Sequence, residues 1–157
     1  MKIRAGFVSN SSSSSFIVAF PADFKPTFES IKKYIFGSQT GPILNVSVDD
    51  AAKELLVQLK GQRANSKSAI DEALSGWVDG TPSMDSFHKA GSHEIDWDAW
   101  DKAVDAHRAA WWAKKKPALI SGGRRLYIFS FEDKGSLAVL ERGTFLGRVP
   151  HVAISHH

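Results

Sequence analysis

The chain contains no cysteine, and this absence sets the first limits on its chemistry. None of its 157 residues can form a disulfide, bind zinc through a thiolate or act as a cysteine nucleophile. A cysteine-free composition is typical of a reducing compartment. We therefore expect a cytoplasmic protein.

Long apolar runs are also missing. The longest early one, Phe16–Phe20, has five residues and is followed by Pro21. Such a run is too short to span a bilayer or to form the apolar part of a signal peptide, so we expect no membrane partner. Phosphate-binding glycine loops, dinucleotide fingerprints and nucleophile-elbow motifs are absent too. The sequence therefore predicts no catalytic residue and no cofactor, and it favours a protein that is not an enzyme.

What is present is typical of one globular domain. Apolar residues make up 43% of the chain and charged residues 24%, as in ordinary domains of this size. Without a long linker or an internal repeat, residues 1–157 are expected to form a single domain, in which the serine-rich segment 9–15 leads into the first strand. The net charge of +3 permits a nucleic-acid partner but does not indicate one.

Strand and helix patterns predict an α+β fold. Short β-branched and aromatic segments predict strands over 15–20, 43–48, 124–131, 137–140 and 149–155. Apolar residues at helical spacing predict helices over 28–35, 52–59, 68–77 and 96–115, the last ending before Pro117. Short turns between the C-terminal strands favour a meander. We expect a mostly antiparallel sheet of about 4–5 strands with the helices packed on one face.

The helix over 96–115 has the clearest pattern. Its repeating face consists of Trp97, Trp100, Val104, His107 and Trp111. We expect this face to lie across the sheet and Trp100 to be buried. His107 is predicted to be a hydrogen-bonded core histidine rather than a catalytic one, because buried polar groups generally find partners.

A run of small polar residues precedes the first strand. This candidate binding segment consists of Ser9, Asn10, Ser11, Ser12, Ser13, Ser14 and Ser15. Three interpretations stay open: a polar lead-in to the strand, a cradle of backbone N–H groups and hydroxyls for an anion, or an acceptor of phosphate or another covalent group. Apolar residues on both sides, Phe7 and Val8 before and Phe16 and Ile17 after, favour an ordered segment.

Histidines are the candidate metal ligands. His151 and His157 are six residues apart, so they would share one face of a straight strand, with His156 on the other. A site there would need further ligands from the loop, such as His93 or Glu94. No spacing motif demands a metal, and none is predicted.

Basic residues near the end of the long helix are candidate phosphate contacts. They are Lys114, Lys115, Arg124 and Arg125. Neighbouring tryptophans would suit base stacking. Positive charge at a helix C-terminus is also favourable by itself, and the small net charge favours this second interpretation.

The first sixteen residues, MKIRAGFVSNSSSSSF, resemble an N-terminal signature of small uncharacterised proteins of bacteria and their phages. The C-terminal part is similar to theirs as well, with an aromatic strand at 127–131 and a terminal strand, 150–157, that ends in histidine. Where those proteins often carry His-Gly-Asp, this chain has Arg142-Gly143-Thr144 and lacks both side chains. The resemblance implies a bacterial or phage accessory protein, located in the host cytoplasm if a phage encodes it, and implies no activity.

Three function classes follow. The first is a non-enzymatic accessory protein that binds a host protein or nucleoprotein. The second is a small metal- or phosphate-dependent enzyme that uses the C-terminal histidines and the serine segment. The third is a nucleic-acid-binding domain. Absence of catalytic motifs and the family-like ends favour the first.

Overall fold

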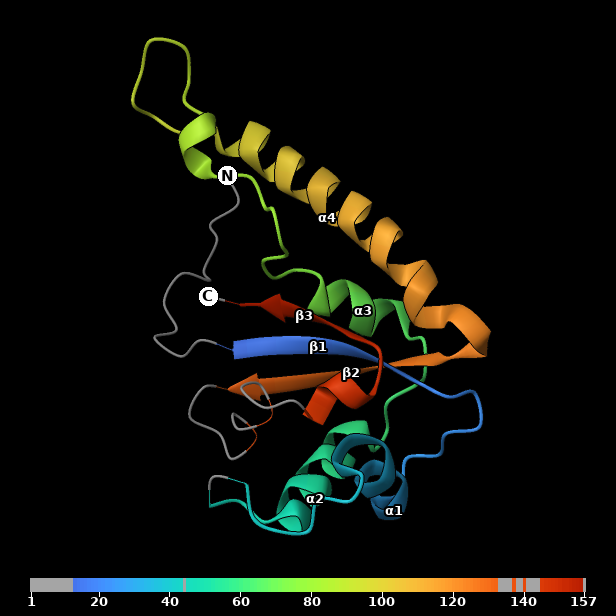
Figure 1. The fold of residues 1–157 in the computed structure, drawn as a ribbon. Helices are drawn as coiled ribbons and strands as arrows, with labels where there is room; N and C mark the ends of the chain where they lie inside the picture. Colours follow the sequence, from blue (N-terminus) through green and yellow to red (C-terminus); the bar gives the residue numbers. More distant parts are fainter. Residues whose placement is uncertain (1–12, 44, 133–136, 138–139, 141–144, 157) are drawn as a thin grey trace.

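The protein is built around a three-stranded antiparallel sheet (Figure 1). The computed structural model describes residues 13–43, 45–132, 137, 140 and 145–156. In this part of the chain, β1 (Ser13–Phe20) lies between β2 (Arg125–Glu132) and β3 (His151–Ser155) and is antiparallel to both. The α+β class is therefore confirmed, while the sheet is smaller than the predicted four to five strands.

Two of the predicted strand features are wrong. Ile43 pairs only with Val46 in an isolated bridge, and Val48 already begins a helix, so no strand forms over 43–48 among the residues described there. The C-terminal strands do not form a meander, because β1 separates β2 from β3. The predicted strand 137–140 lies mostly outside the described residues.

The described α-helices all lie between β1 and β2 in the chain. They are α1 (Phe28–Ile31), continued as one π-helical turn over Lys32–Phe36, then α2 (Val48–Leu59), α3 (Lys67–Ala73) and α4 (Trp97–Ile120), with 3-10 turns at Met84–Ser86, Ser121–Gly123 and Phe145–Arg148. The α-helices begin after Thr27, Ser47, Ser66 and Asp96, and each of these side chains accepts a hydrogen bond from a backbone N–H of the first turn. Such capping stabilises the helix start because these N–H groups have no partner within the helix.

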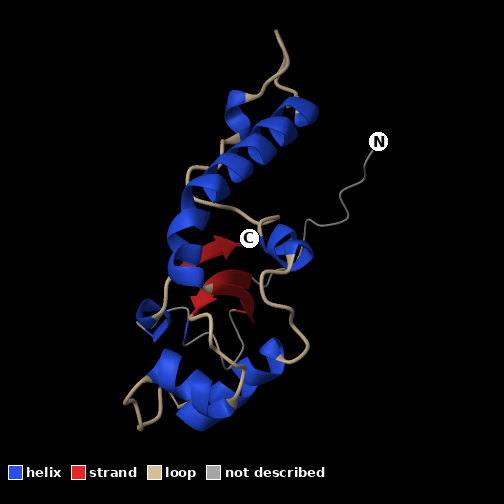
Figure 2. Cartoon of the chain, turned by 90° about the vertical axis from the view of Figure 1, so that its right-hand side faces the viewer, coloured by secondary structure: helices blue, strands red, loops and turns tan. Residues whose placement is uncertain are grey.

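Helices cover both faces of the sheet, not one as predicted (Figures 1 and 2). Phe16, Val18 and Phe20 of β1 point to one face, where they form a large buried cluster with α1, the π-helical turn and α2. Ile17 and Ala19 point to the other face, where a smaller cluster includes residues of α3 and α4. Because β1 is apolar at both even and odd positions, it needs cover on both sides, as is typical of a central strand.

Helix α4 has two unlike halves. Its C-terminal half packs on the sheet through Leu119, with Trp111 and Trp112 partly buried beside it. The helix passes through Pro117 and ends at Ile120, five residues later than predicted. Pro117 is exposed, so the carbonyl that loses its helical partner to this proline can be hydrated instead.

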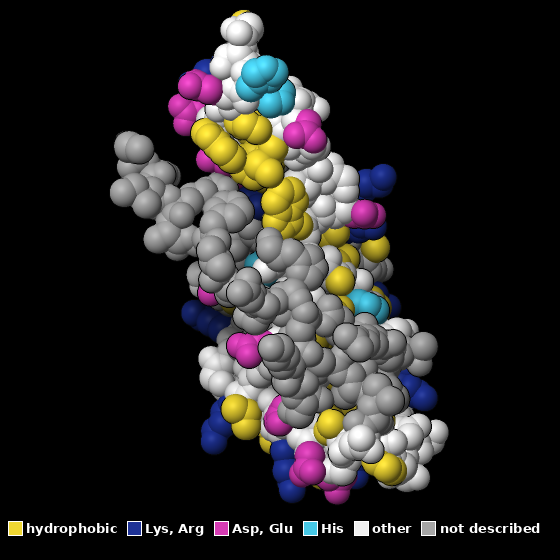
Figure 3. Space-filling model, turned by 90° about the vertical axis from the view of Figure 1, so that its left-hand side faces the viewer, with side chains coloured by type: hydrophobic (Ala, Val, Ile, Leu, Met, Phe, Trp, Pro, Cys, Tyr) yellow, Lys and Arg dark blue, Asp and Glu magenta, His cyan; other side chains and the backbone are white. Residues whose placement is uncertain are grey.

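The N-terminal half of α4 projects beyond the sheet (Figure 1). Trp100 is buried as predicted, but it packs on Trp77 and donates from Nε1 to the carbonyl of Pro82 at 3.1 Å rather than lying on the sheet. Trp97 is 54% exposed, and Figure 3 shows apolar side chains gathered toward this end of the molecule. The tryptophan face is therefore divided between the sheet and the projecting loop.

None of the described helices combines the length and apolar character needed to cross a membrane.

Candidate functional site

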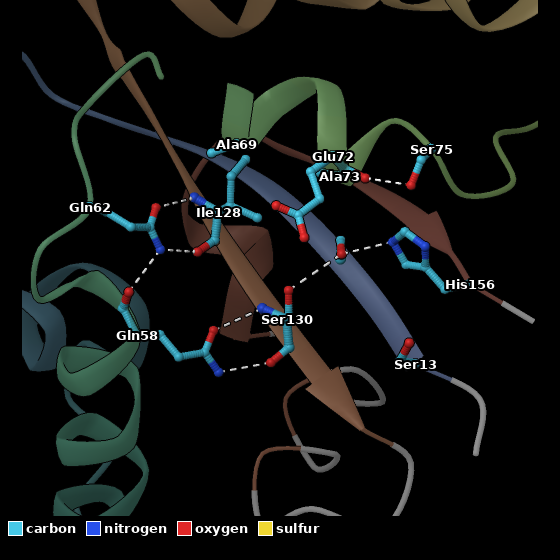
Figure 4. Close-up of a pocket in the computed structure, with 11 residues that line it drawn as sticks. Ser13, Gln58, Gln62, Ala69, Glu72, Ala73, Ser75, Ile128, Ser130 and His156 are labelled. Carbon is cyan, nitrogen blue, oxygen red and sulfur yellow. Dashed lines mark hydrogen bonds between the residues drawn. The ribbon is translucent and has the colours of Figure 1, made fainter. Parts of the chain in front are cut away.

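An open groove lies between the α3 face of the sheet and the helices α2 and α3 (Figure 4). Its volume is about 670 Å³. The lining residues are Ser13, Ser15, Gln58, Gln62, Ala69, Glu72, Ala73, Ser75, Ile128, Ser130 and His156. The groove thus joins the end of the serine segment to His156, more than 130 residues away in the sequence.

Ser15 and His156 form the central contact of the groove. The backbone N–H of His156 donates to the carbonyl of Ser13 at 2.9 Å, which continues the pairing of β3 with β1. Ser15 is opposite Ile154 in this register, so His156 lies diagonally across from it, within reach of a long side chain. The distance from Ser15 Oγ to His156 Nε2 is 2.9 Å, that of a good hydrogen bond.

A second hydroxyl approaches Ser15 from the other side. Ser130 of β2 is the direct cross-strand partner of Ser15. Their Oγ atoms are 3.4 Å apart, which is longer than a good O–H···O bond. Both hydroxyls and the imidazole therefore face the same space, from three adjacent strands.

Gln58 of α2 and Gln62, which follows the end of that helix, form one wall. Gln62 donates from Nε2 to the carbonyl of Ile128 at 2.6 Å and accepts from its N–H at 2.9 Å. Gln58 makes the same pair of bonds with Ser130, both at 2.8 Å. Asn65, with φ of 58°, repeats the pattern on Leu126 through its own N–H and its Oδ1.

These three amide residues replace a neighbouring strand along the outer edge of β2. The edge of a sheet otherwise presents a row of unpaired N–H and C=O groups, which is a hazard for aggregation. Because the carboxamides of Gln58 and Gln62 are committed to β2, they hold the wall in place and are not free to bind a ligand by the same atoms.

Helix α3 forms the opposite wall. Ala69 and Ala73 are small, which keeps the groove open, and Figure 4 shows the Glu72 carboxylate directed toward the groove. Ser75 donates from Oγ to the carbonyl of Glu72 at 2.6 Å. Glu72 is the one carboxylate among the described lining residues, which include neither Lys nor Arg.

Gly76 allows the chain after α3 to approach β3. Trp77 exchanges backbone hydrogen bonds with Ser155, N–H to carbonyl at 2.5 Å and 3.0 Å. A Cβ on Gly76 would lie 2.4 Å from the carbonyl oxygen of Ser155 and 2.8 Å from Cε1 of His156. Because residue 76 has no side chain, the His156 ring can lie close to its backbone; any larger residue would push the ring away.

The predicted binding segment divides among three places. Ser13 and Ser15 line the groove. Ser14 is buried and, by strand alternation, points to the opposite face. Ser9 to Ser12, including Asn10, lie outside the described residues. The segment is thus partly a strand, and its last residue is the one that meets a histidine.

The predicted metal candidates are not brought together in the described part of the chain. His151 lies on the large-core face with its ring 6.1 Å from that of Phe16, and its Nδ1 is 3.0 Å from the carbonyl of Val149. His157 lies outside the described residues. His88 Nδ1 is 3.2 Å from the carbonyl of His93. Within the described ranges, no three His, Asp or Glu side chains gather to form a metal site.

The predicted phosphate contacts lie away from the groove, at the end of α4 and the start of β2. Lys114, Lys115 and Arg125 are exposed, while Arg124 donates to the carbonyl of Ala118 at 3.3 Å. Lys115 Nζ lies 5.9 Å from the centre of the Trp111 ring, but Trp111 is itself partly buried against the sheet.

His107 is hydrogen-bonded as predicted, with Nε2 2.8 Å from the carbonyl of Asp79, although it is partly exposed.

Sequence reasoning missed most of the groove. The sequence places His156 on the strand face opposite the metal candidates His151 and His157, and no pattern singles out Glu72. The available signals are a polar residue within a strand, such as Ser130, and two glutamines, Gln58 and Gln62, close together in the sequence. Neither signal predicts which residues of the folded chain these side chains contact.

The comparisons with known proteins add no relative. No protein-family model, curated protein or solved structure matches this chain.

Proposed function

We propose that this chain is a binding protein that holds a segment of a partner macromolecule in the groove, as an accessory factor acting on a host protein or nucleoprotein. The observation that carries this proposal is the groove itself. Its volume of about 670 Å³ falls in the range of specific ligand sites, roughly 300–1,000 Å³, and it is open enough to admit part of a larger molecule.

The chemistry of the lining indicates which segment fits. Hydroxyls of Ser13, Ser15 and Ser130 offer hydrogen bonds along the strands, while Ile128 and the alanines of α3 offer a small apolar surface. Glu72 supplies negative charge that no Lys or Arg of the described lining offsets. A segment that presents a basic side chain to Glu72 matches this arrangement, since charge complementarity steers encounter and fixes register.

Capture experiments with a charge-reversed groove test the proposal. The wild-type chain, Glu72→Lys and Asp71→Lys are each immobilised and exposed to a bacterial lysate, and retained proteins are quantified by mass spectrometry. Asp71 is a matched control because it precedes Glu72 on α3, is exposed and pairs only with Lys67 in an i,i+4 ion pair, which contributes little.

We expect a partner that wild type and Asp71→Lys retain and that Glu72→Lys retains at least about tenfold less, because like charges across an interface are strongly unfavourable. A partner lost equally from both variants would point to a general charge effect. A partner retained by all three chains would place the binding surface outside the groove.

A second candidate function is nucleic-acid binding, which the cluster of basic residues favours. Residues 114–125 contain no Asp or Glu, and their basic side chains are Lys114, Lys115, Lys116, Arg124 and Arg125. If about four of these contact phosphates, the logarithm of affinity should fall against the logarithm of salt concentration with a slope near −3 to −4. Affinity that does not change when Lys114, Lys115, Arg124 and Arg125 are all reversed in charge would exclude this function.

A further inference from the structure

We infer that Ser15 is a nucleophile activated by His156, so that the groove can carry out acyl transfer to Ser15 and hydrolysis of the resulting ester. This activity goes beyond the proposed binding of a partner, which requires neither a base nor a reacting atom. The substrate class is a small activated acyl compound, such as an ester with a good leaving group.

The first argument is the geometry of the pair. Ser15 Oγ and His156 Nε2 are 2.9 Å apart, within the range of about 2.6–3.2 Å expected of a nucleophile and its general base. Of the described serines that line the groove, Ser15 is the one placed against an imidazole. Ser75, by contrast, is bonded to a backbone carbonyl.

The second argument is the rigidity of the supports. Ser15 lies on the central strand, paired with β2 on one side and β3 on the other. The backbone of His156 is held by its N–H bond to Ser13, and the space beside its ring is limited by the close approach of Gly76. Reacting groups on strands hold their geometry better than groups on loops, and orientation is a large part of catalysis.

The third argument is access and charge stabilisation. Ser15 is only 6% exposed, but it lines the open groove together with His156, so a small substrate would approach its Oγ through that groove. The Ser130 hydroxyl, 3.4 Å from Ser15 Oγ, is a donor beside the position where an oxyanion would develop. Side-chain hydroxyls can serve as oxyanion donors when they are held in place.

The reaction step balances without a metal or cofactor. As Ser15 Oγ bonds to the acyl carbon, its proton passes to His156 Nε2 and the carbonyl electron pair moves to oxygen. The tetrahedral intermediate collapses, the bond to the leaving group breaks, and the leaving oxygen takes the proton from His156. Water then attacks the acyl-serine by the same route, with His156 as base, and releases the carboxylic acid and free Ser15.

The experiment uses the full chain and an alkyl fluorophosphonate as the probe. Its P–F bond breaks as Ser15 Oγ bonds to phosphorus, fluoride leaves and the proton passes to His156, so the adduct is stable and can be located by peptide mass spectrometry. The variants are Ser15→Ala and His156→Gln. The matched controls are Ser38→Ala and His88→Gln, an exposed serine and an exposed histidine that do not line the groove.

We expect one adduct per chain, on Ser15, absent in Ser15→Ala and formed about 100-fold or more slowly in His156→Gln, since a general base contributes at least about this factor. The control variants should react as wild type does. Circular dichroism establishes that each variant is folded before its rate is compared. An unlabelled wild-type chain, an adduct on another residue, or an equal rate without His156 would each overturn the inference.

Failure of this inference and failure of the proposed function can be told apart. The two are tested by separate measurements: labelling of Ser15 in the wild-type chain tests the nucleophile, and partner capture by wild type and Glu72→Lys tests the proposed function. Loss of labelling with retained partner binding removes only the nucleophile. A partner retained by Glu72→Lys, together with normal labelling of Ser15, removes only the proposed function.

Discussion

The two faces of β1 differ in what they contribute. Phe16, Val18 and Phe20 enter the large core and are at most 5% exposed. On the other face, Ile17, Ala19 and Ser15 are buried as well, and Ser13 and Ser15 extend the same row to the lining of the groove. One strand therefore anchors the fold with one set of side chains and presents polar groups with the other.

This difference explains why a serine segment can be ordered without burying much surface of its own. Serine gains little from burial, while fixing a residue in a strand costs roughly 1–2 kcal/mol of backbone entropy. The large core on the opposite face and the pairing of β1 with two strands offset that cost. Small side chains at Ser13 and Ser15 then leave room for a ligand, where larger ones would fill the groove.

The largest effect is expected on the large-core face. Phe129 is fully buried on β2, next to Phe20 and Phe131. Phe129→Ala should lower the free energy of unfolding by about 3–5 kcal/mol, because it removes buried surface and leaves a cavity. Urea unfolding followed by fluorescence measures this. The control is Val57→Ala, which removes an apolar side chain that is 70% exposed and should change stability by less than about 0.5 kcal/mol. Equal effects would show that the assignment of the core face is wrong.

The second effect is expected where α3 approaches β3. Gly76→Ala places a methyl group against the carbonyl oxygen of Ser155 and the ring of His156, so the backbone must shift, at a cost of about 1–3 kcal/mol. The shift should also move His156 away from Ser15 and slow labelling of Ser15. Gly147→Ala is the matched control, since a Cβ there meets nothing within 4 Å. Thermal unfolding together with the labelling rate checks both effects, and a Gly76→Ala chain as stable as wild type would contradict the packing.

How far the sequence predicted this arrangement depends on how local each feature is. Strand ends, the start of α4 and the burial of Trp100 follow from short patterns, and these predictions are close to the structure. The order β2-β1-β3 depends on pairing between segments more than 100 residues apart, which no periodicity encodes. The prediction of helices on one face is wrong because β1 is apolar at both even and odd positions. This pattern indicates a strand, but it also indicates that both faces of the strand are covered.

The groove was predicted in its parts but not as a site. The serine segment was singled out by composition, and the C-terminal histidines by their chemistry. His156 meets Ser15 because of the antiparallel register that the Ser13 and His156 backbones adopt. A register shift of one residue would have turned His151 to that face instead. Register is set by packing of the whole sheet, so local reasoning could not place His156 beside Ser15.

The third effect concerns the groove wall. Gln62→Leu keeps the size of the side chain but removes both of its hydrogen bonds to Ile128. Leaving a partly buried N–H and C=O without partners should cost about 1–3 kcal/mol, and the Ile128 amide should exchange with solvent faster. Gln39→Leu is the control, because Gln39 is exposed and donates only to the carbonyl of Gly41. An unchanged exchange rate at Ile128 would mean that the amide ladder does not protect the edge of β2.

The smallest effect is expected from an ion pair on the outside of the large-core face. Lys32 Nζ lies 2.9 Å from Asp49 Oδ1, and this hydrogen bond to the carboxylate raises the pKa of Lys32 above its ordinary value. A raised pKa in the folded state means that the charged amine favours folding below the pKa of the unfolded chain, near 10.4. The contribution is then lost as the pH rises through the higher folded value.

Asp49→Asn tests this sign directly. It should return the pKa of Lys32 toward that of a free lysine, measured by NMR titration of the side-chain amine, and should slightly lower stability at neutral pH but not at a pH above the titration of Lys32. Asp50→Asn is the matched control, because Asp50 shares the first turn of α2 and hence its favourable interaction with the helix dipole. Since exposed ion pairs are weak, the loss should be far smaller than that of Phe129→Ala. A loss of similar size would mean that charge, rather than packing, holds this face together and would remove the contrast between the two faces of β1.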